Sequence, residues 1–350
     1  MTTPTPTPTP IPTGLRILLT LASFIVVATG IWAAQPILVP VLFAAFLAII
    51  SGPTMTWLIQ RRVPRPAALL MVVLGMATIG VTVVIVIGQS LYSFRDNLET
   101  YKEPLQQKVA AITDRLTEAG IEVSESARAD NLNTDNAVDY LKTLLGGLTN
   151  LFGKGLFVLF SFVFIVLEAS GFPAKVAAMP GDTSARLERW KTIITETRRY
   201  FALKTVISLV TGITIGVLLA MLKVPYAPLW ALMAFLFNFI PNIGSIIAAV
   251  PPIVVTFIVL DTSTLVWVIG IYLAINLLVG NMIEPRIMGK GLGLSTLVVF
   301  LSLVFWGFVL GPVGMLLSVP LTMIVKIILS ASDDTRWLSL LLSDEVAEPV

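Results

Sequence analysis

Residues 276–320 read NLLVGNMIEPRIMGKGLGLSTLVVFLSLVFWGFVLGPVGMLLSVP, and this stretch decides the fold class of the chain. An almost charge-free apolar run reaches the polar group Glu284-Pro285-Arg286 and then resumes, interrupted only by glycines and prolines. Charged groups beside a bilayer are costly to place without partners. Non-helical backbone at membrane depth persists only where protein buries it or where it lines a cavity. Polar groups and helix breakers in one apolar segment therefore indicate a path or a binding site for a solute. The breakers of the resumed run are Gly307, Gly311, Pro312, Gly314 and Pro320.

The composition of the whole chain places it in a membrane. Hydrophobic residues make up 56% of the 350 residues, charged residues make up only 13%, and the mean hydropathy is +0.91. A soluble domain carries about 25% charged residues. The net charge of +2 gives no reason to expect a nucleic-acid partner. The chain has neither cysteine nor histidine, which excludes thiolate nucleophiles, Cys-based metal sites and the usual zinc and Ser-His sites. It also lacks a phosphate-binding glycine-rich motif, so we expect no enzyme, no metal and no cofactor.

Eight hydrophobic segments follow one another along the chain, at lengths that approach or exceed the roughly 20 residues that span a bilayer. Residues 15–34 could be mistaken for a signal peptide, but only Arg16 supplies positive charge before them, so we expect a retained first span. The pattern predicts an all-α polytopic membrane protein in which residues 228–260 and 295–329 are broken or re-entrant. The remaining segments are residues 36–59, 66–88, 156–167, 205–222 and 264–283.

The segments divide the chain into six parts. Residues 1–14 alternate Thr and Pro, which favours a solvated, disordered tail. Residues 15–88 hold the first three spans, and residues 89–154 form a polar insert outside the membrane. Residues 155–204 hold the fourth span and a basic linker. Residues 205–330 form the transport core with its two broken helices, and residues 331–350 are a C-terminal tail.

Basic residues in the short loops predict the orientation. Arg61, Arg62 and Arg65 stand in the loop between the second and third spans without an acidic residue, and residues 171–204 hold seven Lys or Arg. Residues 89–154 instead hold seven basic and ten acidic residues. If each of the first four spans crosses once, both basic loops are cytoplasmic. We therefore expect a bacterial inner-membrane protein with a cytoplasmic N-terminus and an external insert.

The insert carries two apolar stripes with helical spacing. The first runs from Leu91 to Leu116, where we expect Pro104 to kink or restart the helix, and the second runs from Val138 to Phe152. The stripes fit equally well a helical hairpin within one chain or a coiled-coil-like contact between subunits.

A further amphipathic helix is expected between Asp182 and Phe201, where basic side chains lie opposite an apolar face. It fits a helix on the surface of an anionic leaflet, and it also fits a linker packed beneath the membrane domain. We favour the membrane surface, which makes lipids a partner.

The two longest apolar segments resemble each other. Pro241 and Gly244 break the first behind an aromatic-rich half, and Gly311 and Pro312 break the second in the same way seventy residues later. Proline inside a helix costs about 3 kcal/mol. Paired breaks at corresponding positions are known markers of transporter sites. We favour discontinuous or hairpin helices over simple kinked spans.

The polar side chains near these breaks are the candidates for a solute path. Their amide and carboxylate oxygens can bond a hydroxylated solute or a small cation. The sequence pattern places Asn281 and Glu284 on one helix face. Glu284 could instead pair with Arg286 or Lys290 as a structural clamp. Glu284 and Glu168 are the candidates for proton or ion coupling. The expected path comprises Asn238, Pro241, Asn242, Gly244, Asn276, Asn281, Glu284, Arg286, Gly311 and Pro312.

Six motifs stand at residues 61–65, 204–205, 240–244, 284–289, 291–297 and 316–322. They resemble the autoinducer-2 exporter family of bacterial membrane transporters, and the match covers most of the chain. The family implies an eight-segment inner-membrane exporter of a small furanosyl signal used in quorum sensing, assembled as a homopentamer with an elevator-like mobile unit. Other relatives are proposed to exchange sodium or protons, so the fold does not fix the substrate. The family assigns no ligand-contacting residues here.

Three functions remain open at the level of sequence. The first is a secondary transporter that exports a small polar solute, with autoinducer-2 as the first candidate. The second is a sodium or proton antiporter that uses Glu284 or Glu168. The third is a non-transporting membrane scaffold that oligomerises through residues 89–154, although a scaffold needs no broken helices.

Overall fold

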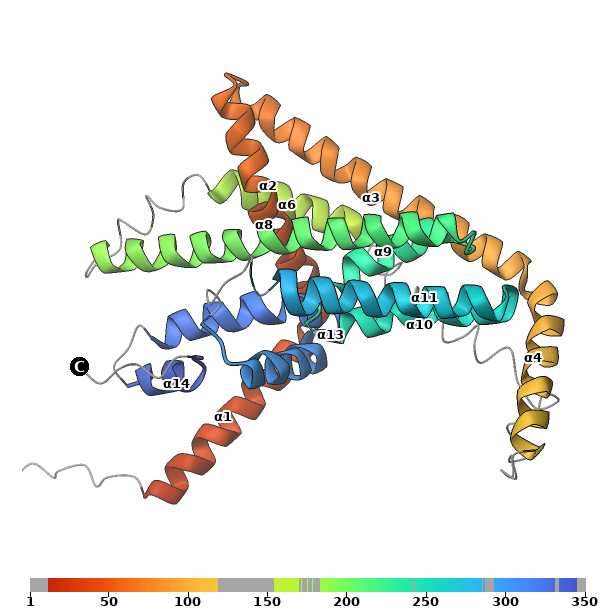
Figure 1. The fold of residues 1–350 in the computed structure, drawn as a ribbon. Helices are drawn as coiled ribbons and strands as arrows, with labels where there is room; N and C mark the ends of the chain where they lie inside the picture. The colour runs from red at the N-terminus through yellow and green to blue at the C-terminus, as the bar shows by residue number, and fades with distance from the viewer. Residues whose placement is uncertain are drawn as a thin grey trace, which may run out of the picture.

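The computed structural model describes residues 12–118, 154–169, 171, 175, 178, 183–241, 243–284, 286, 293–330 and 334–344. These residues form helices and include no strand, which confirms the all-α architecture (Figure 1). All eight predicted hydrophobic segments lie on helices. Among the described residues, five helices are long and apolar enough to cross a membrane, by length and composition alone. The chain is a multi-pass membrane protein.

The N-terminal part is built on α2 (Gln35–Gln60), which leads through a tight turn at Arg62 into α3 (Arg65–Asp96). Arg62 has a φ of 66°, the left-handed conformation that reverses the chain. Ala44 of α2, Val72 of α3 and Phe162 of α6 (Gly155–Ala169) share one buried cluster. α1 (Thr13–Ala33) extends away from the body of the molecule (Figure 1).

The expected basic linker and the fifth span form one continuous helix, α8 (Thr183–Met221). The division that we placed at residue 204 therefore falls inside a helix. Thr197, Tyr200 and Phe201 are buried, so the inner face of the linker packs under the membrane domain. The sequence separates the two parts by their charge, but no glycine or proline interrupts residues 183–211, and the backbone continues.

The first broken segment is a helical hairpin, called hairpin 1. Its legs are α9 (Ala227–Phe237) and α10 (Gly244–Val259), joined by residues 238–243. At 1.5 Å per residue, α9 is about 16 Å long, too short for a hydrocarbon core of about 30 Å. Gly244 lies so close to α9 that a Cβ there would be 1.8 Å from the carbonyl oxygen of Phe237. Only glycine fits at this tip.

The second broken segment, α13 (Thr296–Leu329), folds back on itself at Gly311 and is called hairpin 2. Gly311 has a φ of 69° and a ψ of −154°. Trp306 Nε1 donates a hydrogen bond of 3.0 Å to Thr322 Oγ1, although 16 residues of straight helix span about 24 Å. A Cβ on Gly314 would be 2.0 Å from the carbonyl oxygen of Trp306. Both broken segments are therefore hairpins with a glycine against the opposite leg, and neither is a kinked span.

The two hairpins enter the structure from opposite ends. The base of hairpin 1 lies beside α4 (Leu98–Glu118), whereas the base of hairpin 2 lies beside α14 (Arg336–Leu341) at the other end (Figure 1). At the second base, Lys326 Nζ donates to the carbonyl oxygen of Gly293. Both tips pack into the same buried cluster, which contains Phe239 of hairpin 1 and Val313 of hairpin 2.

The first stripe of the insert begins on the last turns of α3 and continues on α4. The chain turns between them at Asn97, and α4 runs through Pro104 without ending there. The Tyr101 hydroxyl lies 2.9 Å from the hydroxyl of Tyr226 at the start of hairpin 1. Burial, the hydrogen bond and the neighbouring phenol raise the pKa of Tyr101 well above its usual value. Lys108 Nζ donates to two carbonyl oxygens at the end of α10, and this position also suits the helix dipole. At least α4 of the insert therefore packs within its own chain; the second stripe lies outside the described residues.

Candidate functional site

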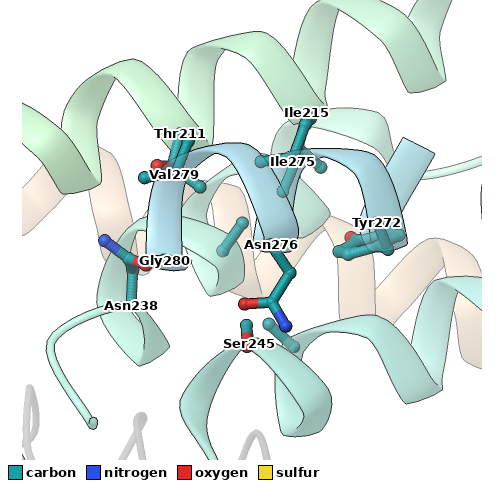
Figure 2. Close-up of a pocket in the computed structure, with 11 residues that line it drawn as sticks. Thr211, Ile215, Asn238, Ser245, Tyr272, Ile275, Asn276, Val279 and Gly280 are labelled. Carbon is teal, nitrogen blue, oxygen red and sulfur yellow. The ribbon is translucent and has the colours of Figure 1, made fainter. Parts of the chain in front are cut away.

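A small cavity lies between α8, hairpin 1 and the helix that follows hairpin 1 (Figure 2). That helix is α11 (Thr262–Ile275), which continues as the π-helix η3 (Asn276–Ile283). The cavity volume is about 20 Å³, measured as the space that the centre of a water molecule can occupy. This space holds about one water molecule. Its lining is Thr211, Ile215, Ala234, Asn238, Ser245, Ala248, Tyr272, Ile275, Asn276, Val279 and Gly280.

Asn238 joins the tip of hairpin 1 to α8. It ends α9, and its Nδ2 donates a hydrogen bond of 2.9 Å to Ser208 Oγ, a fully buried hydroxyl on α8. An amide in an apolar environment needs such a partner, because burial without one costs a few kcal/mol. Asn238 therefore fixes the tip against α8 and contributes a polar group to the cavity.

Asn276 stands at the point where α11 becomes π-helical. The wider turn shifts the side chains that follow from their α-helical positions, and such segments often occur at functional sites. The Asn276 amide points across the cavity toward Ser245 (Figure 2). Gly280 stands close behind it, because a Cβ there would be 3.3 Å from Asn276 Oδ1. The small glycine leaves room for this amide.

Tyr272 brings a hydroxyl without a partner to the cavity. The side chain is 6% exposed, and its oxygen is buried with no hydrogen bond to any described residue. Buried polar groups are nearly always bonded to protein or to water, so an unpaired one calls for an explanation. Since Tyr272 lines the cavity, a bound water or solute is the natural partner.

Among the described lining residues, none is Lys, Arg, Asp or Glu. The polar groups are amides and hydroxyls, from Thr211, Asn238, Ser245, Tyr272 and Asn276. They can donate and accept hydrogen bonds but bring no fixed charge. The described residues also contain no group of acidic side chains that could hold a metal ion. The site suits an uncharged polar solute.

An ion pair near the cavity joins α8 to the residue that directly follows η3. Lys204 of α8 donates to Glu284, the residue that follows η3. The Lys204 side chain is only 3% exposed and that of Glu284 is 23% exposed. Glu284 therefore forms an ion pair, but its observed partner is Lys204. Arg286 is exposed, and Lys290 lies outside the described residues.

The structure brings only part of the expected path together. Asn238 and Asn276 line the cavity, Gly244 holds the tip, Pro241 lies in the tip turn, and Glu284 is paired nearby. Asn242 lies outside the described residues. The positions away from the cavity are Asn281 and Arg286, both exposed, and Gly311 and Pro312 at the tip of hairpin 2.

Glu168 is the next-to-last residue of α6 and does not line the cavity. Its side chain is 58% exposed and pairs with Lys175, which is 64% exposed. An exposed pair of this kind is worth little. Asn281 and Glu284 also differ in exposure, because the π-helical turn changes which positions share a face.

Sequence reasoning missed the contribution of α8. Lys204, Ser208 and Thr211 stand four and three residues apart, a polar stripe on one face of an apolar span. This spacing was a readable signal. Ser245 and Tyr272 carried none, since a single serine or tyrosine in an apolar segment is ordinary.

Comparison with known proteins shows which family the chain is similar to. The family model described as "AI-2E family transporter" matches residues 21–334. The AI-2 transport protein TqsA of Escherichia coli K12 is 40% identical over 95% of this chain and 96% of its own length. The putative transport protein YhhT of the same organism is 36% identical over 94% and 95%. A putative transport protein of Haemophilus influenzae is 37% identical over 94% and 96%.

The match covers both hairpins, the cavity and the ion pair. It identifies a membrane transporter and not an enzyme, and it sets the scaffold function aside. This chain belongs to the AI-2E transporter family.

Proposed function

We propose that this transporter exports a small polar solute across the bacterial inner membrane, with autoinducer-2 as the first candidate. The cavity at the tip of hairpin 1 carries the proposal, since a buried and unpartnered Tyr272 hydroxyl faces uncharged amides and hydroxyls there. The printed name of TqsA, which assigns it AI-2 transport, supplies the candidate solute.

The cavity volume fits a closed state. Space for about one water cannot hold a furanosyl solute, so hairpin 1 or η3 has to move before the solute binds. The two hairpins enter from opposite ends, an arrangement that suits alternating access around a midplane site. We propose that both are re-entrant in the bilayer and that the unit they form moves as an elevator.

Solute flux into vesicles tests this function. The full-length protein is reconstituted, and uptake of labelled autoinducer-2 is measured beside a panel of neutral polyols, sugars and charged solutes. Tyr272→Phe removes only the unpartnered oxygen, and we expect it to weaken solute affinity severalfold while the protein stays folded. Tyr92→Phe is the matched control, because Tyr92 is 73% exposed on α3. Equal flux of all solutes, or unchanged affinity in Tyr272→Phe, would count against the cavity.

A sodium or proton antiporter is the second candidate, and the buried Lys204–Glu284 pair favours it. An antiporter needs a group that changes its charge state during transport, and an intramembrane carboxylate is a common one. An imposed sodium or proton gradient separates the two functions. An antiporter moves the ion without any organic solute, whereas a solute exporter shows ion flux only when the solute is present.

The cellular setting is part of the proposal. We propose that the N-terminus is cytoplasmic, that lipids contact the exposed apolar helices, and that the protein is a homo-oligomer, for which the resemblance implies a pentamer. Light scattering of the detergent-solubilised protein tests the subunit number. Labelling of a single cysteine placed at Thr13, in a chain that naturally has none, tests the orientation.

A further inference from the structure

The face of α8 that carries Lys204 also carries polar groups toward the cavity, and it faces both η3 and the tip of hairpin 1. Lys204, Ser208 and Thr211 share this face of α8, since they stand four and three residues apart. On the opposite side, Asn276 and Gly280 line the cavity and Glu284 follows four residues after Gly280. We call this contact between α8 and the α11–η3 helix the seam.

The ion pair closes one end of the seam. Lys204 stands seven residues before Thr211, which is about 10 Å along the helix. The pair therefore lies two turns from the cavity, on the side of the basic N-terminal part of α8. The Thr205 hydroxyl beside it is buried without a partner among the described residues.

The chemistry of the pair fits a closure that separates. A buried ion pair adds little net stability, because removing both charges from water costs about as much as their attraction returns. The pair can therefore separate at a small net cost provided that water or a polar solute takes up both charges as it opens. Glu284 directly follows the π-helical segment, which is a kind of turn often found at functional sites.

We propose that the Lys204–Glu284 pair is the inner closure of the cavity. It holds η3 against α8, and a solute reaches the cavity from the basic end of α8 only when the pair separates. The role of the closure in solute entry rests on the proposed transport function, whereas the closure itself is a property of the fold. Lys204 is thus a positioning residue, which acts through Glu284 and η3.

Access to the cavity can be measured without any solute. The chain contains no cysteine, so Ser245→Cys places a single thiol in the cavity wall. A membrane-impermeant maleimide is applied to sealed vesicles of either orientation that hold the full-length protein. We expect slow labelling from both sides when the Lys204–Glu284 pair is intact.

Removal of either charge is expected to open one side only. Lys204→Met or Glu284→Gln in the Ser245→Cys background should speed labelling about tenfold or more, from the side of the basic end of α8. The exchanged pair, Lys204→Glu with Glu284→Lys, should return the rate toward that of the intact pair. Lys175→Met is the matched control, because it breaks the exposed pair with Glu168 and should leave the rate unchanged.

A cross-link tests the same closure if a single variant fails to fold. Lys204→Cys with Glu284→Cys is joined by a short bis-methanethiosulfonate, which forms a disulfide with each thiolate and releases methanesulfinate. The cross-link should stop flux, and cleavage of the disulfides by a reductant should restore it. Unchanged labelling in folded variants, a gain only from the α4 side, or full flux through the cross-linked protein would each overturn the proposal. If no solute is transported in the flux assay but the variants speed labelling as expected, the proposed function is rejected and the proposed closure is retained.

Discussion

Hairpin 1 and hairpin 2 share one construction but differ in how they are held. Each places a glycine against a backbone carbonyl of its opposite leg, at Gly244 and at Gly314. The base of hairpin 1 is held by α4, which contributes Tyr101 and the double hydrogen bond of Lys108. The base of hairpin 2 is held by Lys326 and the backbone beside α14. Of the two hairpins, only hairpin 1 contributes described residues to the cavity, and it is the one that α4 restrains.

The largest effect is expected at the two glycines. Gly244→Ala and Gly314→Ala each place a methyl group about 2 Å from a carbonyl oxygen, so the legs must separate. Overpacking costs about 1–3 kcal/mol and can exceed it when backbone is the obstacle. We expect both variants to lose most folded protein, measured as the monodisperse fraction after extraction.

Gly270→Ala on α11 is the control for these variants. A Cβ there meets nothing within 4 Å, and alanine is the better helix former by about 1 kcal/mol. We expect no loss of folded protein. If only one of the substitutions Gly244→Ala and Gly314→Ala causes loss of folded protein, the two hairpin tips are not built in the same way.

The next effect concerns the bases. Lys108→Met leaves two carbonyl oxygens at the end of α10 without their donor, whereas Lys326→Met frees one. Hydrogen bonds to charged groups contribute about 1.5–3 kcal/mol, and exposure reduces this value. We expect Lys108→Met to lower the melting temperature by more than Lys326→Met, and to change the flux rate as well. If both variants lowered the melting temperature equally, α4 would shield the base of hairpin 1 without restraining it more than the base of hairpin 2 is restrained.

A smaller effect is expected inside hairpin 2. Trp306→Phe removes the donor to Thr322, a 7% exposed hydroxyl, and should cost about 1–3 kcal/mol because that hydroxyl is left unpaired. Thr322→Val in the same chain removes the unpaired group. In a double-mutant cycle on the free energy of unfolding, the double variant should therefore recover part of the stability that Trp306→Phe loses. If the effects of the two substitutions on the free energy of unfolding were strictly additive, that result would contradict the hydrogen bond.

The smallest effect is a pH dependence at the base of hairpin 1. The pKa of Tyr101 is raised in the folded protein, so the folded state favours the neutral phenol. This contribution to stability is complete below the unfolded pKa of about 10 and declines as the pH rises above it. We expect Tyr101→Phe to flatten the fall of the melting temperature between pH 9 and pH 11, relative to wild type. An identical slope would place the titration elsewhere.

The sequence was sufficient for the hairpins but only partly sufficient for the site. Proline with glycine in segments of more than thirty residues predicted two breaks, because backbone chemistry is local. The cavity depends on α8 approaching hairpin 1 and η3, which is a tertiary contact. The partner of Glu284 lies 80 residues away at Lys204, not in the neighbouring Arg286. Local spacing could reveal the stripe on α8, but not the surface that it faces.

The length of α8 has a mechanical consequence. Its 39 residues form a rod of about 58 Å, nearly twice the thickness of the hydrocarbon core. Such a rod cannot bend with the bilayer over a single turn, so its basic end and its cavity end tilt together. A lipid headgroup or a neighbouring molecule that pulls on the basic end therefore applies torque to the wall of the solute cavity.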